Sequence, residues 1–581
     1  MRLIEIRLLE GPNVYRLEPV VKLELALGRR RTWYGQRDPG RHALVHLGAA
    51  VLPRDWPDAV VAIMDWVRRL RTDHGEGRTG LAVHRSSDPG HWIVTFPWAG
   101  EERARILGEA AYALADRDVS PSRTARLTGA QTRHVERWSE RIAEATASPP
   151  TWIRDADRRI PIVSVSGTNG KSTVTRLITH ILVVAGRHVG TTTSDGVLID
   201  ERMVDEGDWT GPGGAQTVLA RSDIEVAVLE TARGGIVLRG MGYESNDASV
   251  LTNVSSDHLD LQGIHTLPEL AEVKATVCRI TKRDGWVVLN GDDALVARVS
   301  RRVRARVAYF SLAAEGALPG IVRRHLARGG RAYLLLEGWL TEVEGTTSTP
   351  IVEVARVPIT IGGLARHNVA NALAAAGGAR GLGATIEQVR AGLVDFRPSA
   401  ERSPGRLNLF RLGSRLVIVD FAHNEAGISA VLDVAEGLAG GASGRAAPVT
   451  AIIGTAGDRP DDTLRGIGRI AAQRAQRIAI KETRKYLRGR TEAAVIGELL
   501  AGVRAGGASA TDVPIYESET VALRTELKGR GPDSPRVIVL MCHEERDAVF
   551  KLLHDLGARA VDVTAELTTL VPRLQERPRR D

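Results

Sequence analysis

The sequence predicts an α/β protein with three units: an α+β unit at the amino terminus, a central nucleotide-binding unit and a Rossmann-like unit at the carboxyl terminus. Short apolar runs alternate with helical patterns after residue 159, which is typical of parallel βαβ units. One run leads directly into a glycine-rich turn at residues 164–173. The chain has 581 residues, enough for three or four domains at roughly 150 residues each.

Changes in the local pattern set the expected boundaries of these units, at residues 1–148, 149–400 and 401–581. The first unit mixes strand-like runs with helical patterns, at 20–27, 91–96, 58–70 and 101–114. It ends in small residues and a proline pair, which predict a linker because proline cannot continue a helix. Strand candidates of the second unit are 160–165, 225–229, 248–253 and 286–289. Those of the third are 416–420, 449–453, 477–480 and 537–541.

Composition excludes several classes of protein. With 43% hydrophobic and 25% charged residues the chain fits a globular protein. Two cysteines, Cys278 and Cys542, are too few for a disulfide scaffold, so we expect a reducing, cytoplasmic location. Neither a signal peptide nor a run of roughly 20 apolar residues is present, so no membrane partner is expected. The formal charge of +8 is spread along the chain and does not predict a nucleic-acid partner.

The most specific motif is Ser166-Gly-Thr-Asn-Gly-Lys-Ser-Thr173, which follows a strand and opens a helix. Glycines let backbone N–H groups approach phosphate, and a helix N-terminus favours an anion. Lys171 would add a charge at the β- and γ-phosphates of ATP, and the Ser172 hydroxyl would ligate Mg²⁺. The motif differs from the standard Walker loop, because Val165 occupies the position of its first glycine. The other predicted nucleotide contacts in this loop are Gly167, Thr168, Asn169, Gly170 and Thr173.

Polar residues follow two further strands, at the edge where α/β sheets place ligands. Glu230 ends one strand, and its carboxylate suits Mg²⁺ unless it merely caps a helix or faces solvent. His258, in Asp257-His-Leu-Asp260, is either a metal ligand or a hydrogen-bonded structural histidine. Lys274 lies in a helical pattern at 267–280 and could be solvated or paired with phosphate.

Two later segments add candidates. Asn368 and Asn371 stand three apart and share a helix face, where an amide can pair with adenine or cap the helix. Arg406 lies near the start of the third unit, and its guanidinium suits phosphate unless it is one more surface arginine. Asp420, His423 and Asn424 follow the strand candidate at 416–420, where a plain strand-to-helix turn is the alternative.

Together these motifs resemble the Mur ligases, ATP-dependent amide-forming enzymes that include the folylpolyglutamate synthetases. The resemblance implies a Mur-type central domain in which Ser172, Glu230 and His258 hold metal at two sites. It makes Lys274 a candidate for carbamylation by CO₂, which requires a neutral amine and hence a lowered pKa. It places Asn368 or Asn371 at the adenine, Arg406 at the phosphates, and Asp420, His423 and Asn424 near the ribose and phosphates. The implied catalytic residues are Lys171, His258, Lys274 and Arg406.

Longer stretches narrow the resemblance to the carboxyl-terminal half of cyanophycin synthetases, at residues 190–196, 207–212, 229–235 and 399–410. That half joins arginine to the β-carboxylate of a polyaspartate chain. The ATP-grasp module that adds aspartate in those enzymes cannot fit between residues 148 and 164. The resemblance therefore implies that this chain does not make the whole polymer alone and could work beside a separate ATP-grasp ligase. Residues 539–545 match no pattern of the family.

The function expected from these features is an ATP-dependent ligase that forms an acyl-phosphate. It would join an amino acid, arginine or similar, to a carboxylate of an aspartate-containing peptide or polymer. One alternative is glutamate addition to a folate-like or cell-wall precursor. Another is a non-catalytic, polymer-binding subunit of a synthetase. Cyanophycin synthetases are homo-oligomers, and by analogy alone this chain would be one too.

Overall fold

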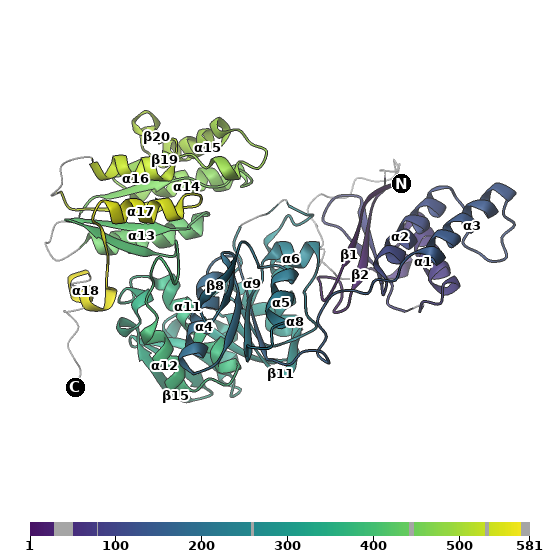
Figure 1. The fold of residues 1–581 in the computed structure, drawn as a ribbon, viewed down its shortest axis with the longest axis horizontal. Coiled ribbons are helices and arrows are strands. Elements are labelled where there is room, and N and C mark those ends of the chain that lie inside the picture. Colours follow the sequence, from purple (N-terminus) through teal and green to yellow (C-terminus); the bar gives the residue numbers. More distant parts are fainter. Residues whose placement is uncertain are drawn as a thin grey trace.

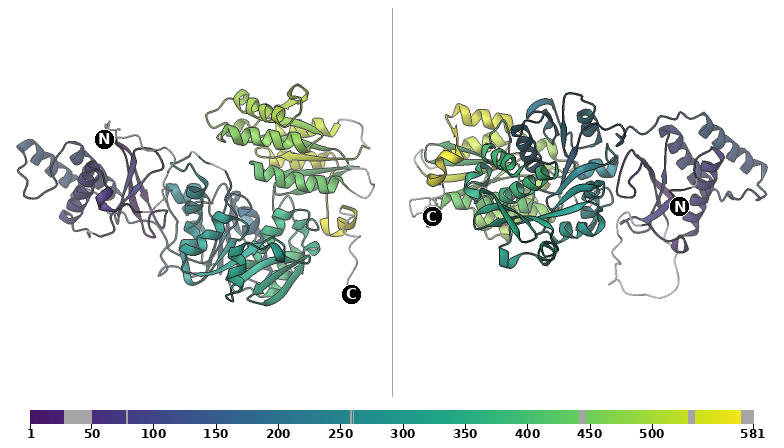
Figure 2. Two further views of the ribbon diagram at one scale, coloured as in Figure 1. Left: turned by 180° about the vertical axis from the view of Figure 1, so that it is seen from behind. Right: turned by 90° about the horizontal axis from the view of Figure 1, so that it is seen from below.

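The computed structural model describes residues 1–27, 50–77, 79–256, 259, 261–440, 447–528 and 534–570. Within them three β-sheets follow one another along the chain, each with its own helices (Figure 1). Figure 2 shows that the amino-terminal and carboxyl-terminal bodies lie at opposite ends of the central body. The predicted α/β class with an α+β amino-terminal body is confirmed. None of the helices in these ranges has the length and apolar character that crossing a bilayer requires.

The amino-terminal sheet is antiparallel, with strand order β1-β2-β4-β3. Its strands are β1 (Arg2–Leu9), β2 (Val20–Ala26), β3 (Ala82–Arg85) and β4 (His91–Pro97). Helices α1 (Asp58–Asp73) and α2 (Glu101–Asp116) cover one face, and α3 (Gly129–Glu144) packs beside α2. Side chains alternate along β2, so Val21 and Leu23 join the core with the helices while Lys22 and Glu24 point to the other face. Both charged side chains are nevertheless buried, because the central body covers that face.

The central sheet has eleven strands in the order β15-β14-β13-β12-β11-β10-β5-β9-β6-β7-β8. Strands β13 through β6 in this order are parallel, and antiparallel pairs extend both edges. The strands are β5 (Ile162–Ser166), β6 (Val189–Thr192), β7 (Gly196–Ile199), β8 (Arg202–Glu206), β9 (Val226–Glu230), β10 (Asn246–Leu251), β11 (Thr281–Asn290), β12 (Arg306–Ser311), β13 (Arg331–Leu336), β14 (Trp339–Glu344) and β15 (Thr347–Glu353).

Helices cover both faces of this sheet and make a separate apolar core on each. One face carries α4 (Lys171–Val184), α11 (Arg366–Gly381) and α12 (Ile386–Asp395). The other carries α5 (Pro212–Leu219), α6 (Arg233–Leu238), α7 (Leu267–Lys274), α8 (Thr276–Arg279), α9 (Ala294–Ala297) and α10 (Gly320–Leu326). The single helix expected at 267–280 is divided at Ala275, because the Cys278 N–H bonds to the Ala275 carbonyl in the tighter i→i+3 pattern.

The carboxyl-terminal sheet has seven strands in the order β20-β19-β18-β21-β17-β16-β22. They are β16 (Asn408–Leu412), β17 (Arg415–Asp420), β18 (Val449–Ile453), β19 (Arg477–Lys481), β20 (Ile515–Tyr516), β21 (Arg536–Met541) and β22 (Arg559–Ala560). The helices are α13 (Glu425–Ala439), α14 (Asp461–Arg474), α15 (Glu492–Ala505), α16 (Glu519–Lys528), α17 (Arg546–Asp555) and α18 (Val563–Leu570). Val563 of α18 shares a core with Ile361 and Ala365 of the central body, so this helix ties the two bodies together (Figure 1).

Parallel neighbours place the candidate residues at one edge of the central sheet. Strands β10, β5 and β9 lie side by side, and their carboxyl ends lead to residue 252, the glycine-rich loop and Glu230. The carboxyl end of β17 brings Asp420 to the facing edge of the carboxyl-terminal sheet, beside Arg406. The site therefore lies between two sheets, as the sequence predicts for a ligand site of an α/β protein.

Two glycines of α15 test how closely this helix packs on α14. A Cβ at Gly502 would lie 2.0 Å from the Arg465 carbonyl oxygen, whereas one at Gly497 would meet no atom within 4 Å. We expect Gly502→Ala to lower the free energy of unfolding by roughly 1–3 kcal/mol through overpacking. Gly497→Ala should raise it by about 0.5–1 kcal/mol through helix propensity. Urea unfolding of both variants checks this, and equal effects would contradict the close α14–α15 contact.

Candidate active site

The glycine-rich loop between β5 and α4 is packed against two other segments. Gly167 and Gly170 have φ values of +147° and +86°, which favour glycine. A Cβ at Gly170 would lie 2.4 Å from Oδ1 of Asn371, and one at Gly167 would lie 1.9 Å from Oγ1 of Thr252. Both positions therefore require glycine for the backbone and for the space around it, and the loop has little room to change shape.

Side chains beneath the loop hold its backbone. Asn253 accepts the N–H of Asn169 at 2.9 Å and donates to its carbonyl at 2.9 Å. The Thr168 N–H bonds to the Asn253 carbonyl, and the Lys171 amine donates to the Thr168 carbonyl at 2.9 Å. Lys274, buried at the end of α7, donates from Nζ to the Gly167 carbonyl at 2.6 Å. Thr173 is buried in the first turn of α4. The predicted loop residues thus form one rigid unit at a helix N-terminus.

An oxygen-rich corner adjoins the loop at Glu230. The Ser172 hydroxyl donates to Oε1 of Glu230 at 3.1 Å, and the Ser194 N–H donates to Oε2 at 3.3 Å. Burial raises the pKa of Glu230, although Lys171 and Arg406 oppose this shift. Oxygen donors of this kind are the ligands Mg²⁺ takes, and a cation would offset the cost of burying the carboxylate. Ser172 and Glu230 therefore fit Mg²⁺, whereas the predicted ligand His258 lies outside the described residues.

Arg406 reaches this corner from the carboxyl-terminal side. Its guanidinium donates to the Ser172 hydroxyl at 3.3 Å and lies 4.7 Å above the ring of Phe421. Asp420 accepts the N–H groups of Leu407 and Ala422, each at 2.8 Å. Burial raises the pKa of Asp420 to about 6, with Arg406 opposing the shift. Phe421 supplies an aromatic face that supports the guanidinium.

Of the three asparagines predicted outside the glycine-rich loop, Asn424 and Asn371 contact the loop and Asn368 does not. The amides of Asn424 and Asn169 bond reciprocally at 3.0 and 3.4 Å across the two bodies. Asn371 adjoins Gly170 and donates to Oδ1 of Asn368 at 3.0 Å. Asn368 donates to the Ile359 carbonyl and so lies one step behind the loop. An adenine contact by either residue of α11 stays a prediction.

His423 belongs to the turn that also carries Asn424. Its Nδ1 lies 3.0 Å from the Phe421 carbonyl oxygen, and its ring contacts the Phe421 ring. The turn is supported from below by a buried cluster in which Lys481 donates to Glu519 at 2.6 Å and contacts Nδ1 of His543 at 2.9 Å. Nε2 of His543 lies 2.9 Å from the Ala422 carbonyl oxygen. This cluster holds the turn in place and includes a residue of the segment 539–545 that the sequence left unassigned.

Asp195 is a member of the site that the sequence did not single out as a functional residue. Arg176 of α4 and Arg546 of α17 each donate to its carboxylate at 2.9 Å, so it joins the central and carboxyl-terminal bodies. Burial favours a higher pKa, but Arg406, Arg546 and Arg176 outweigh it and hold the pKa of Asp195 below its usual value. Arg176 lies four residues after Ser172, a helical spacing that places both on one face and could have drawn attention to it.

The arginines around Asp195 outnumber the acids they pair with. Within the described ranges, the buried Nε atoms of Arg176, Arg406 and Arg546 have no hydrogen-bond partner. Lys171 and Arg406 both act on the neighbouring Glu230 carboxylate. This surplus of cationic donors, at the N-terminus of α4, is suited to an anionic ligand such as a polyphosphate or a carboxylate.

Comparison with known proteins assigns the middle of the chain to a known domain family. Residues 165–379 match the family Mur ligase middle domain, so the central body contains this domain. The chain is 42% identical to cyanophycin synthetase of Crocosphaera subtropica over 341 residues, which are 58% of this chain and 38% of that protein. It is 28% identical to UDP-N-acetylmuramoyl-L-alanyl-D-glutamate–2,6-diaminopimelate ligase of Alkalilimnicola ehrlichii, across 80% of this chain and 90% of that protein. The chain spans less than half the length of the cyanophycin synthetases it matches.

One solved structure that this chain resembles is the ligand-free bifunctional folylpolyglutamate synthase/dihydrofolate synthase of Yersinia pestis. The match has 18% sequence identity and a TM-score of 0.49, and it covers 68% of this chain and 90% of that one. The resemblance to Mur ligases that the motifs indicate is confirmed by the family match in the middle of the chain.

Loss of the Asp195 charge should loosen the contact between the two bodies. In Asp195→Asn the guanidiniums of Arg176 and Arg546 lose their shared counter-charge and repel each other, so we expect faster deuterium uptake at residues 402–406. Hydrogen–deuterium exchange read by mass spectrometry measures this. Asp200→Asn is the matched control, because Asp200 pairs with the exposed His188 on a nearby hairpin. Unchanged uptake in Asp195→Asn would show that Asp195 does not hold the bodies together.

Proposed function

We propose that this chain is an ATP-dependent amide ligase that joins an amino acid, arginine or similar, to a carboxylate of an aspartate-containing peptide or polymer. The observation that carries the proposal is the meeting, at the Ser172 hydroxyl, of the glycine-rich loop, the buried Glu230 and Arg406 from the other body. The named activities of the relatives, cyanophycin synthesis above all, support the ligase class and this substrate class.

The reaction begins with binding of the ATP phosphates to the loop. Backbone N–H groups at the start of α4 and the Lys171 ammonium receive the phosphates, and Arg406 approaches from the opposite side. A carboxylate oxygen of the acceptor attacks the γ-phosphorus, the bond to the β,γ-bridging oxygen breaks, and ADP leaves. The product is an acyl-phosphate. The amine of the amino acid then attacks the acyl carbon, phosphate leaves, and the nitrogen loses a proton to give the amide.

The site residues orient these groups more than they react with them. Mg²⁺ bound at Ser172 and Glu230 would neutralise charge on the transferring phosphoryl group. Arg176, Arg406 and Arg546 supply cationic donors where the phosphates and the acceptor carboxylate must come together. Because Arg406 and Asn424 belong to the other body, the site is complete only when the two bodies are in contact, which excludes water from the acyl-phosphate.

Lys274 has a defined place in this proposal whether or not it is carbamylated. Its Nζ donates to the Gly167 carbonyl at 2.6 Å, so it braces the loop that receives the phosphates. A carbamate would keep one N–H for this bond and add two oxygens able to support a metal. Carbamylation of Lys274 stays a proposal that rests on the family resemblance.

A second candidate is addition of an amino acid to a cell-wall peptide precursor. It is favoured by the match to the 2,6-diaminopimelate ligase, which extends over 90% of that protein. The higher identity to cyanophycin synthetases favours the first candidate. A non-catalytic role is disfavoured because Lys171, Ser172 and Glu230 are all present and adjoin one another. A separate ATP-grasp ligase that supplies the aspartate backbone is the partner this proposal implies.

The experiment that tests the proposal is phosphate release from Mg-ATP by the purified chain. Acceptors are polyaspartate primers, β-Asp-Arg peptides, a folate and UDP-muramoyl dipeptide, each combined with arginine, lysine, glutamate or diaminopimelate. We expect release that requires both an aspartate-containing acceptor and a basic amino acid. Release only with the muramoyl acceptor would establish the second candidate. No release with any pair, in protein that still binds ATP, would contradict a ligase acting on these substrates.

Lys171 should be essential to this activity. Removing its ammonium in Lys171→Ala takes away charge stabilisation at the phosphates, so we expect kcat to fall about a hundredfold or more. Lys282→Ala is the control, because Lys282 pairs with Asp247 on the surface, away from the loop. Steady-state phosphate release measures both variants. A Lys171→Ala rate within threefold of the wild type would remove Lys171 from the catalytic residues.

A further inference from the structure

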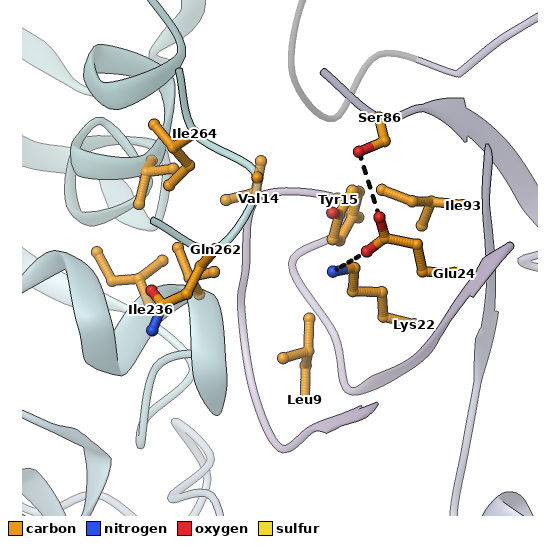
Figure 3. Close-up of a pocket in the computed structure, with 13 residues that line it drawn as sticks. Leu9, Val14, Tyr15, Lys22, Glu24, Ser86, Ile93, Ile236, Gln262 and Ile264 are labelled. Atoms are coloured by element: carbon orange, nitrogen blue, oxygen red, sulfur yellow. Dashed lines mark hydrogen bonds and ion pairs between the residues drawn. The ribbon is translucent and has the colours of Figure 1, made fainter. Parts of the chain in front are cut away.

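A pocket separates the amino-terminal sheet from the central body, remote from the nucleotide loop. It has two unlike walls. Lys22, Glu24 and Ser86 line the side of the sheet, whereas Ile236, Gln262 and Ile264 line the central side (Figure 3). None of these residues has a part in the ligase mechanism. The polar wall therefore calls for a separate explanation.

Three potential metal ligands gather at the edge of this pocket. The ligand atoms of Glu24, Asp88 and His91 all lie within 4.8 Å of one another. Glu24 and His91 stand on the neighbouring strands β2 and β4, and Nδ1 of His91 lies 2.9 Å from Oε1 of Glu24. Asp88 comes from the turn between β3 and β4. Antiparallel pairing therefore brings the three residues together on the face of the sheet turned away from its helices.

A histidine of the central body contacts one member of this group. Nε2 of His265 lies 2.9 Å from Oδ1 of Asp88. His265 directly precedes Thr266, the residue that caps α7, and the Glu269 side chain holds the backbone N–H groups of both. Glu269 is in turn hydrogen-bonded to Ser87, next to Asp88 in the chain. His265 is thus held in place by a capping box that itself touches the amino-terminal body.

We propose that Glu24, Asp88 and His91 form a binding site for a divalent transition-metal ion, best suited to Zn²⁺, and that His265, beside Asp88, completes it from the central body. Two imidazole nitrogens and two carboxylate oxygens are a donor set that zinc takes in four-coordinate sites. Imidazole ligands favour zinc over Mg²⁺ and Ca²⁺, which prefer oxygen alone. The side chains of Glu24 and His91 are 9% and 20% exposed, so a bound ion would be shielded from water on the sheet side.

Lys22 is the feature that opposes a cation here, and its geometry limits the conflict. Its ammonium lies 2.7 Å from Oε2 of Glu24, the oxygen turned away from His91, and 3.2 Å from Oε2 of Glu5. Oε1 of Glu24 is left facing His91. Lys22 thereby orients the carboxylate from behind, as partners of metal ligands commonly do. Glu5 also pairs with Lys22 and is shared with Arg7.

A metal at this place would fasten the amino-terminal body to the central body, because three ligands come from one and the fourth from the other. The ion would also fix the start of α7, whose last residue, Lys274, contacts the glycine-rich loop. The site is independent of the proposed ligase activity, and binding can be measured without any substrate.

Zinc binding to the untagged full-length chain tests the proposal. We expect one Zn²⁺ per chain, measured by competition with a chromogenic chelator. Excess Mg²⁺ is present to occupy the oxygen-rich corner at Glu230, so that Zn²⁺ does not bind there. We expect Asp88→Asn and His91→Gln each to weaken binding at least tenfold. His188→Gln should bind as the wild type, since His188 lies in the central body and pairs with Asp200. The site would be overturned if the wild type failed to bind one equivalent of Zn²⁺. It would also be overturned if Asp88→Asn and His91→Gln bound Zn²⁺ as tightly as the wild type.

Two further measurements separate ligand loss from misfolding and test the contribution of the central body. Co²⁺ in place of Zn²⁺ should give the visible absorption of a four-coordinate site with nitrogen and oxygen ligands. Loss of this absorption in a variant shows directly that a ligand has been removed. His265→Gln should weaken Zn²⁺ binding and alter the Co²⁺ spectrum. If His265→Gln matches the wild type in both, the proposal of a site shared between the two bodies is wrong. Circular dichroism confirms that each variant is folded.

Discussion

The hydrogen bond between the Ser172 hydroxyl and the buried Glu230 carboxylate is the contact on which the rest of the site depends. It joins the first turn of α4 to the end of β9, two elements that meet because β5 and β9 are parallel neighbours. Arg406 donates a hydrogen bond to the same hydroxyl, so this contact also helps to position the carboxyl-terminal body. A side chain with two lone pairs and one proton can serve all these partners, which a bulkier or apolar residue could not.

The two buried acids near this hydroxyl differ in how their charge is satisfied. Asp195 has arginines on both sides, and their attraction outweighs burial, so the pKa of Asp195 is lowered. Glu230 lies close to Lys171 and Arg406, yet burial prevails and its pKa is raised. Asp195 therefore has ion pairs with arginines of both bodies, whereas the cost of burying the Glu230 carboxylate is left for a cation to offset. The same corner thus contains a structural acid and an acid that fits a metal.

Local pattern predicted the parts of this site that depend on sequence neighbours. The loop at 166–173, the strand before it and the acid at the end of β9 each follow from residues within a short window. The ion pair of Asp195 with Arg546 joins residues 351 positions apart, and that of Lys481 with Glu519 joins two separate elements. The spacing of apolar residues along the chain cannot predict either pair. The division of the expected helix at 267–280 was also missed, because apolar spacing does not distinguish an i→i+4 from an i→i+3 bond at Ala275.

Among the described residues, the central body lies between the amino-terminal and carboxyl-terminal bodies. Helix α7 of the central body contacts both the amino-terminal body and the phosphate loop. Its capping box meets Ser87 of the amino-terminal body, and its last residue, Lys274, meets the Gly167 carbonyl. The loop that Lys274 braces contacts Asn424 of the carboxyl-terminal body through Asn169. A short helix of eight residues with both ends anchored has few ways to move except as a unit. This helix therefore links the amino-terminal sheet directly to the carbonyl group of Gly167 in the phosphate loop.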